Sequence, residues 1–318
     1  MNQTKKKNPL KRLLSMRGMG QVVTVTIGLI VLLVAFALIN PNFWSPTNRT
    51  NLLRQIAPIL IIGIAQSYVL ITGNIDLSIG SVVGMSTMVA ATLMSKGIMS
   101  PIPALLVTLL CCLLIGVLNG LLVAKFKLPP FIATLGTMTV ARGIAQLVNG
   151  NYNTDSIMKF YPEAAQTFKN VFYYGKTLGL YNGIWIAIIL WIVFNFLLSK
   201  TRTGRYIYAT GSNIDAARLS GVNVVSTTVI AYVVSAFCSF VVGIITCATV
   251  GQGTMDAGNS YEMYAVAASV IGGVSTLGGQ GILLGTVVGA AIWGTLQNGL
   301  QFAGAPVAIR NIIIGIIV

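Results

Sequence analysis

The sequence consists of long apolar runs separated by short polar stretches. A helix needs about 20 residues to cross a hydrocarbon core about 30 Å thick, and division at the polar stretches leaves ten runs, most of them near this length. The runs cover residues 21–39, 55–72, 77–95, 103–124, 130–149, 180–198, 226–250, 261–273, 281–303 and 307–318. The pattern predicts an all-α, multi-pass membrane protein of about ten transmembrane segments, in which residues 1–318 form one transmembrane domain.

Some of these segments are expected to be short or broken. The eighth run, Tyr261–Gly273, has the length of a broken or re-entrant helix, and the tenth run is also short. Glycines gather near Thr72–Gly80 and near Ile271–Gly281, where we expect backbone groups to leave the helical conformation and to need protein or water partners. Gly116 and Gly120 lie four residues apart, which favours close approach of a second helix.

The composition excludes most other classes of protein. Of the 318 residues 55% are apolar and 8% are charged, whereas a soluble domain carries about 25% charged residues. The lack of histidine removes the commonest general base and most zinc sites, and the four cysteines lie in apolar runs without a metal-binding spacing. We therefore expect no catalytic residue, no metal site and no cofactor bound by this chain.

The charges lie in clusters between the apolar runs, which is typical of a protein embedded in a lipid bilayer and gives no indication of a nucleic-acid partner. A cytoplasmic N-terminus puts twelve lysines and arginines on the inner side and six on the outer side, in agreement with the positive-inside rule. This orientation predicts a basic cytoplasmic arm (1–20), an outer loop (150–179) and a cytoplasmic loop (199–225). The first run is too long for a signal peptide and is expected to be retained.

The cytoplasmic loop contains the signals of a short helix. Ser212 or Asn213 is a suitable N-cap for Ile214–Ser220, and Gly221 is a suitable C-terminal stop. Such a loop can act as a positively charged anchor that sets the topology. A helix rich in small residues is also suited to docking into the groove of a partner, and both alternatives are open at this stage.

Two ionisable residues lie in or next to apolar runs. Asp76 is a functional candidate because a charge at membrane depth is costly, but it can also cap the run that begins at residue 77 from the inner interface. Arg142 is expected to pair within the protein or to extend toward the outer headgroups, with substrate contact as the alternative.

Neutral polar side chains in the spans can offer hydrogen bonds to an uncharged solute, or can hold helices together. Our candidates for a translocation pathway combine such side chains with the residues near the first break. They are Asn74, Asp76, Asn119, Phe131, Thr134 and Asn298.

Several motifs, in this order along the chain, resemble one family. They are Gly73-Asn-Ile-Asp-Leu-Ser-Ile-Gly-Ser81, Leu128-Pro-Pro-Phe-Ile-Ala-Thr-Leu-Gly136, Ala141-Arg-Gly143, the stretch Thr203–Gly221, and Gly272-Gly273 through Gly278-Gly-Gln-Gly281. With them the chain resembles, over nearly its whole length, the permease subunits of ribose-type ABC importers, which carry monosaccharides or a furanose autoinducer. Asn74 stands where the family has a second glycine.

The resemblance implies an importer of the bacterial cytoplasmic membrane that carries a ribose-like pentose or a related sugar. It implies two permease copies with the pathway at their interface, an extracytoplasmic sugar-binding protein, and a separate ATPase subunit that binds ATP and Mg. Gly211–Gly221 would be the coupling helix that enters the ATPase, with an aspartate where the family often has glutamate. The residues implied in coupling are Arg205, Gly211, Asp215, Ala217 and Gly221.

ATP hydrolysis by this chain itself is not expected. Gly175-Lys176-Thr177 has the end of a phosphate-binding loop, but Asn170 replaces its first glycine. The main alternative is an ion-coupled secondary transporter of a small polar solute. That mechanism favours carboxylates inside the membrane, and Asp76 alone comes near to meeting this requirement.

Overall fold

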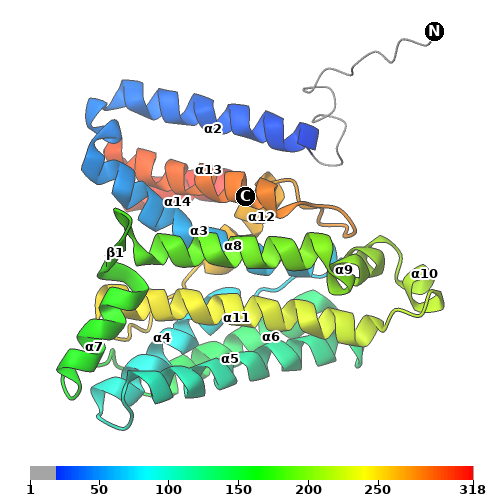
Figure 1. Ribbon diagram of the computed structural model, residues 1–318, viewed down its shortest axis with the longest axis horizontal. Coiled ribbons are helices and arrows are strands. Elements are labelled where there is room, and N and C mark those ends of the chain that lie inside the picture. The colour runs from blue at the N-terminus through cyan, green and yellow to red at the C-terminus, as the bar shows by residue number, and fades with distance from the viewer. Residues whose placement is uncertain (1–18, 318) are drawn as a thin grey trace.

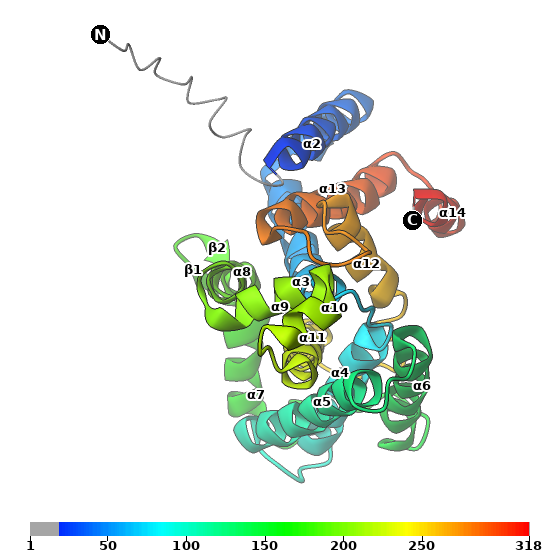
Figure 2. The same ribbon diagram turned by 90° about the vertical axis from the view of Figure 1, so that its right-hand side faces the viewer.

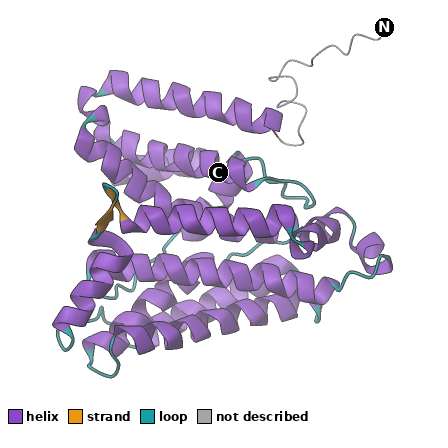
Figure 3. Ribbon diagram, viewed as in Figure 1, coloured by secondary structure: helices purple, strands orange, loops and turns teal. Residues whose placement is uncertain are grey.

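A computed structural model describes residues 19–317, so the predicted basic arm (1–20) lies almost wholly outside the described residues. The regular secondary structure of the described residues is helical except for one small hairpin, β1 (Lys176–Thr177) paired antiparallel with β2 (Leu180–Tyr181) (Figures 1 and 3). The α-helices are α2 (Met19–Ile39), α3 (Pro46–Ile71), α4 (Ile79–Ser95), α5 (Pro101–Ala124), α6 (Pro130–Leu147), α7 (Pro162–Lys169), α8 (Asn182–Lys200), α9 (Arg202–Ser212), α10 (Ile214–Leu219), α11 (Val224–Val250), α12 (Tyr261–Ile271), α13 (Leu283–Phe302) and α14 (Val307–Ile317). Two short irregular helices, η1 (Pro41–Trp44) and η2 (Asn170–Tyr174), precede α3 and follow α7.

The helices begin at local sequence signals. Proline occupies the first turn of α3, α5 and α6, where its missing N–H group leaves no hydrogen bond unmade. Ser45 caps α3 by accepting a hydrogen bond from the backbone N–H of Asn48 at 3.3 Å. The second apolar run was expected to begin at residue 55, and its helix begins earlier because this cap and Pro46 lie in the polar stretch before the run.

The long helices lie side by side, with their connections gathered at two ends of the molecule (Figure 1). One end, which we call the α10 end, carries α9 and α10. The opposite end, called the α7 end, carries α7 and the β-hairpin (Figure 1). Viewed from the α10 end, α9 and α10 lie over the middle of the bundle, while α2 lies at its edge (Figure 2).

Five of the described helices are long and apolar enough to cross a membrane, namely α2, α3, α5, α8 and α11. Together they show a multi-pass membrane protein. The most hydrophobic stretch of α2 is 11% buried within the protein, whereas the corresponding stretches of α3 and α11 are 78% and 72% buried. Because an apolar helix with so little protein around it needs lipid to cover it, α2 is a peripheral helix and α3 and α11 form the core.

Two central helices are short and start inside the bundle. The chain leaves α3 at Ile71 and runs without helical structure through residues 72–78 before α4 begins. Likewise, residues 251–260 separate α11 from the apolar α12. The breaks expected near Thr72–Gly80 and Ile271–Gly281 are confirmed as non-helical segments next to α4 and α12, and the linker 251–260 coincides with the polar stretch between the predicted runs 226–250 and 261–273.

The N-terminal ends of these two short helices meet. A Cβ atom on Gly80, in the first turn of α4, would fall against the carboxylate of Glu262 in the first turn of α12 and against the carbonyl oxygen of Gly258. The lack of a side chain at position 80 therefore permits this approach.

The predicted glycine spacing in α5 is confirmed as a helix contact. A Cβ on Gly116 would lie 2.7 Å from Cβ of Ala236 in α11, and one on Gly120 would lie 2.9 Å from Cγ2 of Val229. The two helices thus approach closely along this face, as small residues allow in a membrane.

Candidate functional site

Asp76 lies in the linker 72–78, buried among three helices. One carboxylate oxygen accepts hydrogen bonds from the backbone N–H of Ser78 at 2.9 Å and from its hydroxyl at 2.6 Å. The other oxygen accepts from the hydroxyl of Ser235, close to the middle of α11, at 2.7 Å. Asp76 does stand at the start of α4, as the capping alternative expected, but it is 2% exposed and lies at the depth of the middle of α11. Its expected position at the inner interface was wrong, because the linker turns back into the bundle.

The hydrogen bonds continue from Asp76 to α5 and α6. Asn119 donates to the hydroxyl of Ser78 at 2.9 Å, and the side-chain oxygen of Asn119 accepts from Thr137 at 2.6 Å. Both ends of the Asn119 amide are therefore engaged within the protein, which is what the helix-holding alternative expects of it. This buried network joins the linker 72–78 to α5, α6 and α11.

The side chains of the other pathway candidates form no hydrogen bond to this network, although Asn74 belongs to the same linker and the backbone carbonyl of Thr134 accepts from Thr137 at 3.2 Å. Thr134 is fully buried and donates to the carbonyl oxygen of Pro130 at 2.8 Å. Asn298 pairs with Asn48 through two amide hydrogen bonds of 2.9 and 3.1 Å. Asn74 donates to the hydroxyl of Thr72 at 2.8 Å, and Phe131 is 56% exposed at the start of α6. The structure brings Asp76 and Asn119 together through Ser78, and leaves Phe131 and Asn298 elsewhere.

Replacement of the central carboxylate is expected to destabilise the protein. Asp76→Ala leaves the hydroxyls of Ser78 and Ser235 without their acceptor, and a buried donor left without a partner costs about 1–3 kcal/mol. The melting temperature of the purified chain in detergent should therefore fall clearly. Asp76→Asn keeps one oxygen acceptor and should have a smaller effect. Equal melting temperatures for Asp76→Ala and the unsubstituted chain would contradict this account.

The predicted short helix in the loop 199–225 is confirmed as α10. The side-chain oxygen of Asn213 accepts from the backbone N–H of Ala216 at 2.8 Å, so Asn213 is the N-cap. Gly221 follows the helix with φ of +82°, a conformation that favours glycine. The sequence did not reveal α9, which is capped by Thr201 through the backbone N–H of Gly204.

The surface of α10 presents apolar side chains to solvent. Leu219 is 91% exposed and Ile214 is 46% exposed, whereas Ala217 is buried against the rest of the loop. Asp215 is exposed and lies 3.5 Å from Arg218 one turn later. Exposed leucine at the tip of a short helix is the kind of surface that a partner groove covers, whereas the family resemblance implied Asp215 and Ala217 as coupling residues and did not indicate Leu219.

Gly211 faces the bundle, against two segments of backbone. A Cβ there would collide with the carbonyl oxygen of Ile71, the last residue of α3, and would lie 2.6 Å from the backbone nitrogen of Gly279. Gly279 itself donates to the Ile71 carbonyl at 2.9 Å. The C-terminal turn of α9 therefore lies directly on the end of α3 and on the loop between α12 and α13.

A tyrosine of α9 strengthens this contact. The Tyr208 hydroxyl donates to the carbonyl oxygen of Gly281 at 2.6 Å. Burial raises the pKa of Tyr208 to about 12, so the phenol stays a neutral donor at physiological pH. Arg205, about one turn earlier in α9, is exposed.

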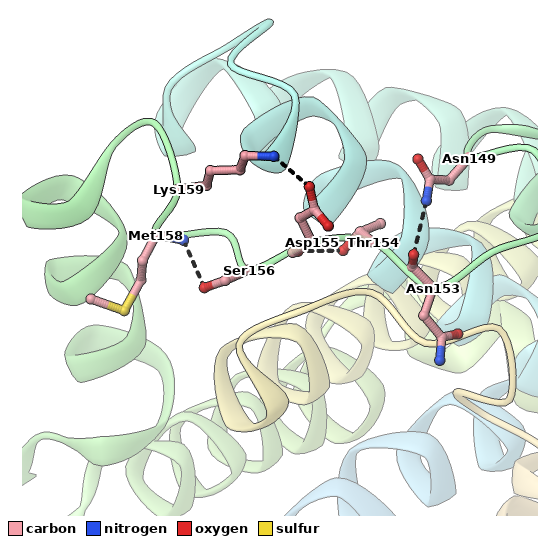
Figure 4. Close-up of polar contacts among 7 residues, drawn as sticks. All are labelled: Asn149, Asn153, Thr154, Asp155, Ser156, Met158 and Lys159. Carbon is pink, nitrogen blue, oxygen red and sulfur yellow. Dashed lines mark hydrogen bonds and ion pairs between the residues drawn. The ribbon is translucent and has the colours of Figure 1, made fainter.

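At the α7 end, the segment 149–159 holds the linker 251–260. The backbone N–H of Thr154 donates to the carbonyl of Gly253 at 2.9 Å, and the N–H of Gly253 returns a bond to the Thr154 hydroxyl at 2.8 Å. The segment is itself braced by local contacts, among them a 2.6 Å ion pair between Lys159 and Asp155 (Figure 4). Lys159 holds the pKa of Asp155 below its ordinary value. The predicted outer loop is thus connected directly to the linker that leads into α12.

Comparison with known proteins places this arrangement in a family. Residues 48–318 match the family described as the permease component of the branched-chain amino acid transport system. The chain belongs to this permease family. Among curated relatives, the ribose import permease of Haemophilus influenzae is 40% identical over 278 residues, covering 86% of this chain and 84% of the relative. That of Bacillus subtilis is 35% identical over 293 residues, covering 92% and 88%.

The permease family also includes carriers of other sugars. The galactose/methyl galactoside import permease of Escherichia coli is 33% identical over 306 residues, covering 91% of this chain and 90% of the relative. The resemblance to permeases of ribose-type importers, first indicated by the motifs, is confirmed. These relatives are transport permeases, the class of protein that the composition and motifs favour over an enzyme.

Proposed function

We propose that this chain is the transmembrane subunit of an ATP-driven importer that moves a monosaccharide, a ribose-like pentose or a related sugar, across the bacterial cytoplasmic membrane. The observation that supports it most is the identity to the ribose import permeases, at 40% and 35% over more than four-fifths of the chain. The family description names amino acids, but the relatives quoted above are sugar permeases. We therefore propose a sugar as the substrate, in line with these relatives and not with the family description.

The proposal places the α10 end in the cytoplasm and the α7 end outside. The excess of lysine and arginine in the arm and in the loop 199–225 supports this orientation. A cytoplasmic ATPase subunit, which binds ATP and Mg, would receive α10 in a groove. Leu219 and Ile214 would make the apolar contact, and Asp215, Arg205 and Arg218 would lie around it.

Movement of α10 would be carried inward through Gly211. Because the end of α9 rests on Ile71 and on Gly279, a displacement of this segment acts on the linker before α4 and on the loop after α12. Both short helices begin inside the bundle, where a change of their position would open or close a pathway. Gly211 would thus transmit the movement of α10 to the bundle, and Ala217 would support α10 from its buried side. The exposed side chains would bind the ATPase subunit.

On the outer side, a sugar-binding protein would dock on the α7 end. The hydrogen bonds between Thr154 and Gly253 connect that surface to the linker 251–260, and so to the first turn of α12. A second copy of the chain would complete the pathway, as the resemblance implies.

The test is uptake of labelled D-ribose by proteoliposomes that contain this chain, its ATPase subunit and its binding protein. We expect uptake only when ATP is available to the ATPase subunit and when the sugar-loaded binding protein is present. Uptake by this chain alone, driven by a proton or sodium gradient and indifferent to ATP, would overturn it in favour of the ion-coupled alternative. The relatives favour the importer.

A further inference from the structure

A cavity of about 370 Å³ lies between α4, α6 and the start of α12, outside the network around Asp76. Small-molecule sites commonly occupy about 300–1,000 Å³. Polar side chains of α4, α6 and the linker 251–260 line the cavity, among them Ser81, Thr139, Gln146 and Asn259. No segment of the described chain fills it.

Two opposite charges line this cavity from different helices. Arg142 of α6 donates from Nη1 to the carbonyl oxygens of Met255 and Ala257, both at 2.9 Å. Glu262 lies in the first turn of α12. Among the described residues these two side chains form no direct ion pair within 4.0 Å. A molecule bound between them can therefore form hydrogen bonds with both.

Glycines of α4 make room for both charged side chains. A Cβ on Gly84 would lie 2.8 Å from Nη1 of Arg142 and 2.7 Å from the carbonyl oxygen of Ala257. One turn earlier, a Cβ on Gly80 would fall against the carboxylate of Glu262. Ordinary side chains at these two positions would displace the guanidinium and the carboxylate from the cavity wall.

The face of α6 beside the cavity is unlike a lipid-facing surface. Gly136, Thr139, Gly143 and Gln146 recur at three- and four-residue spacing and are all exposed. Thr139 donates to the carbonyl oxygen of Leu135 at 3.0 Å within α6, but the amide of Gln146 facing hydrocarbon would lose its hydrogen bonds to water, which costs several kcal/mol in a purely apolar medium. This stripe therefore faces water or a polar solute, and the cavity opens onto it.

We infer that this cavity is a transient binding subsite for the sugar on its way through the membrane. Arg142 would donate to sugar oxygens, Glu262 would accept from sugar hydroxyls, and Gln146 and Thr139 would complete the hydrogen bonds. The two charges sum to zero, which suits an uncharged polyol. A zwitterionic amino acid would satisfy the same two charges, but seven of the nine lining residues are polar or charged, and Met138 is the one apolar side chain among them.

The inference rests on the proposed importer function, and its test uses the complete assembly with D-ribose as the probe. Glu262→Gln and Gln146→Leu should each raise the concentration of D-ribose-loaded binding protein that gives half-maximal uptake, or lower the maximal uptake, by about tenfold. Gln301→Leu, an exposed glutamine at the end of α13 outside this cavity, is the matched control and should behave as the unsubstituted chain.

A second readout measures occupancy directly. A Thr139→Cys chain is labelled with a membrane-impermeant maleimide, and D-ribose supplied during turnover should slow the labelling, whereas L-leucine should not. Unchanged uptake in both cavity variants together with unprotected Thr139→Cys would overturn the subsite while leaving the importer intact. Protection by L-leucine in place of D-ribose would overturn the sugar assignment. A complete assembly without any ATP-dependent D-ribose uptake would overturn the proposed function and this inference with it.

Discussion

Gly211→Val is expected to lower the stability of the chain and to abolish ATP-dependent uptake. The new side chain would collide with the Ile71 carbonyl and with the Gly279 nitrogen. Both are backbone atoms joined by their own 2.9 Å hydrogen bond, so no change of rotamer relieves the contact. Overpacking typically costs about 1–3 kcal/mol, and a backbone collision should reach the upper end of that range. The melting temperature in detergent and D-ribose uptake by the assembly measure the two effects.

The control for this substitution is Gly28→Val in α2, where a Cβ would meet no atom within 4 Å. It introduces the same β-branched side chain into a helix that faces lipid, and its melting temperature should stay near that of the unsubstituted chain. A Gly211→Val chain that melts and transports as the control does would contradict the proposed contact between α9 and the bundle.

Leu219→Asp should leave the chain stable and break its connection to the ATPase subunit. Leu219 is 91% exposed, so the folded chain loses almost no apolar contact when it is replaced. In the assembly the same leucine would be buried in the ATPase groove, where a buried anchor residue contributes about 2 kcal/mol or more to binding. The dissociation constant for the ATPase subunit, measured with the chain in nanodiscs, should therefore rise about 30-fold or more.

Leu178→Asp serves as the matched control, because Leu178 is 87% exposed in the hairpin loop at the opposite end of the molecule. The dissociation constant of the ATPase subunit should not change in this variant. If Leu178→Asp and Leu219→Asp weakened ATPase binding equally, α10 would not be the docking element. The two predictions also separate the two roles: Gly211→Val acts on the fold, and Leu219→Asp acts on the partner.

The membrane-spanning character of the chain was readable from its pattern, because the thickness of the hydrocarbon core acts locally on every segment that crosses it. The cap and stop of α10 were readable for the same reason: Asn213 and Gly221 act within their own turns of backbone. Helix α9 was missed because its residues 202–212 are polar and contain two glycines. Its stability comes from tertiary contacts such as that of Gly211 with Ile71.

The candidate site was likewise predictable only in part. Asp76 and Asn119 were singled out as polar residues in apolar surroundings, a property that each residue shows in its own neighbourhood. Their separate partners were not predictable: Ser235 is 159 residues from Asp76, and nothing in either segment specifies the other. Phe131 and Asn298 have equally suggestive surroundings, yet the fold places them away from the network around Asp76.

Pairings across the bundle depend on which faces of which helices meet, and this is a property of the packed molecule. Arg142 reaches the carbonyl of Met255 across 113 residues of sequence because Gly80 and Gly84 admit the linker 251–260 beside α4. Short stretches of sequence determine the transmembrane segments, the helix caps and the helix breaks, because each depends on hydrogen bonds and hydropathy within a few turns of backbone. The cavity between Arg142 and Glu262 and the contact of Gly211 with Ile71 exist because close packing joins segments that have no local signal for one another.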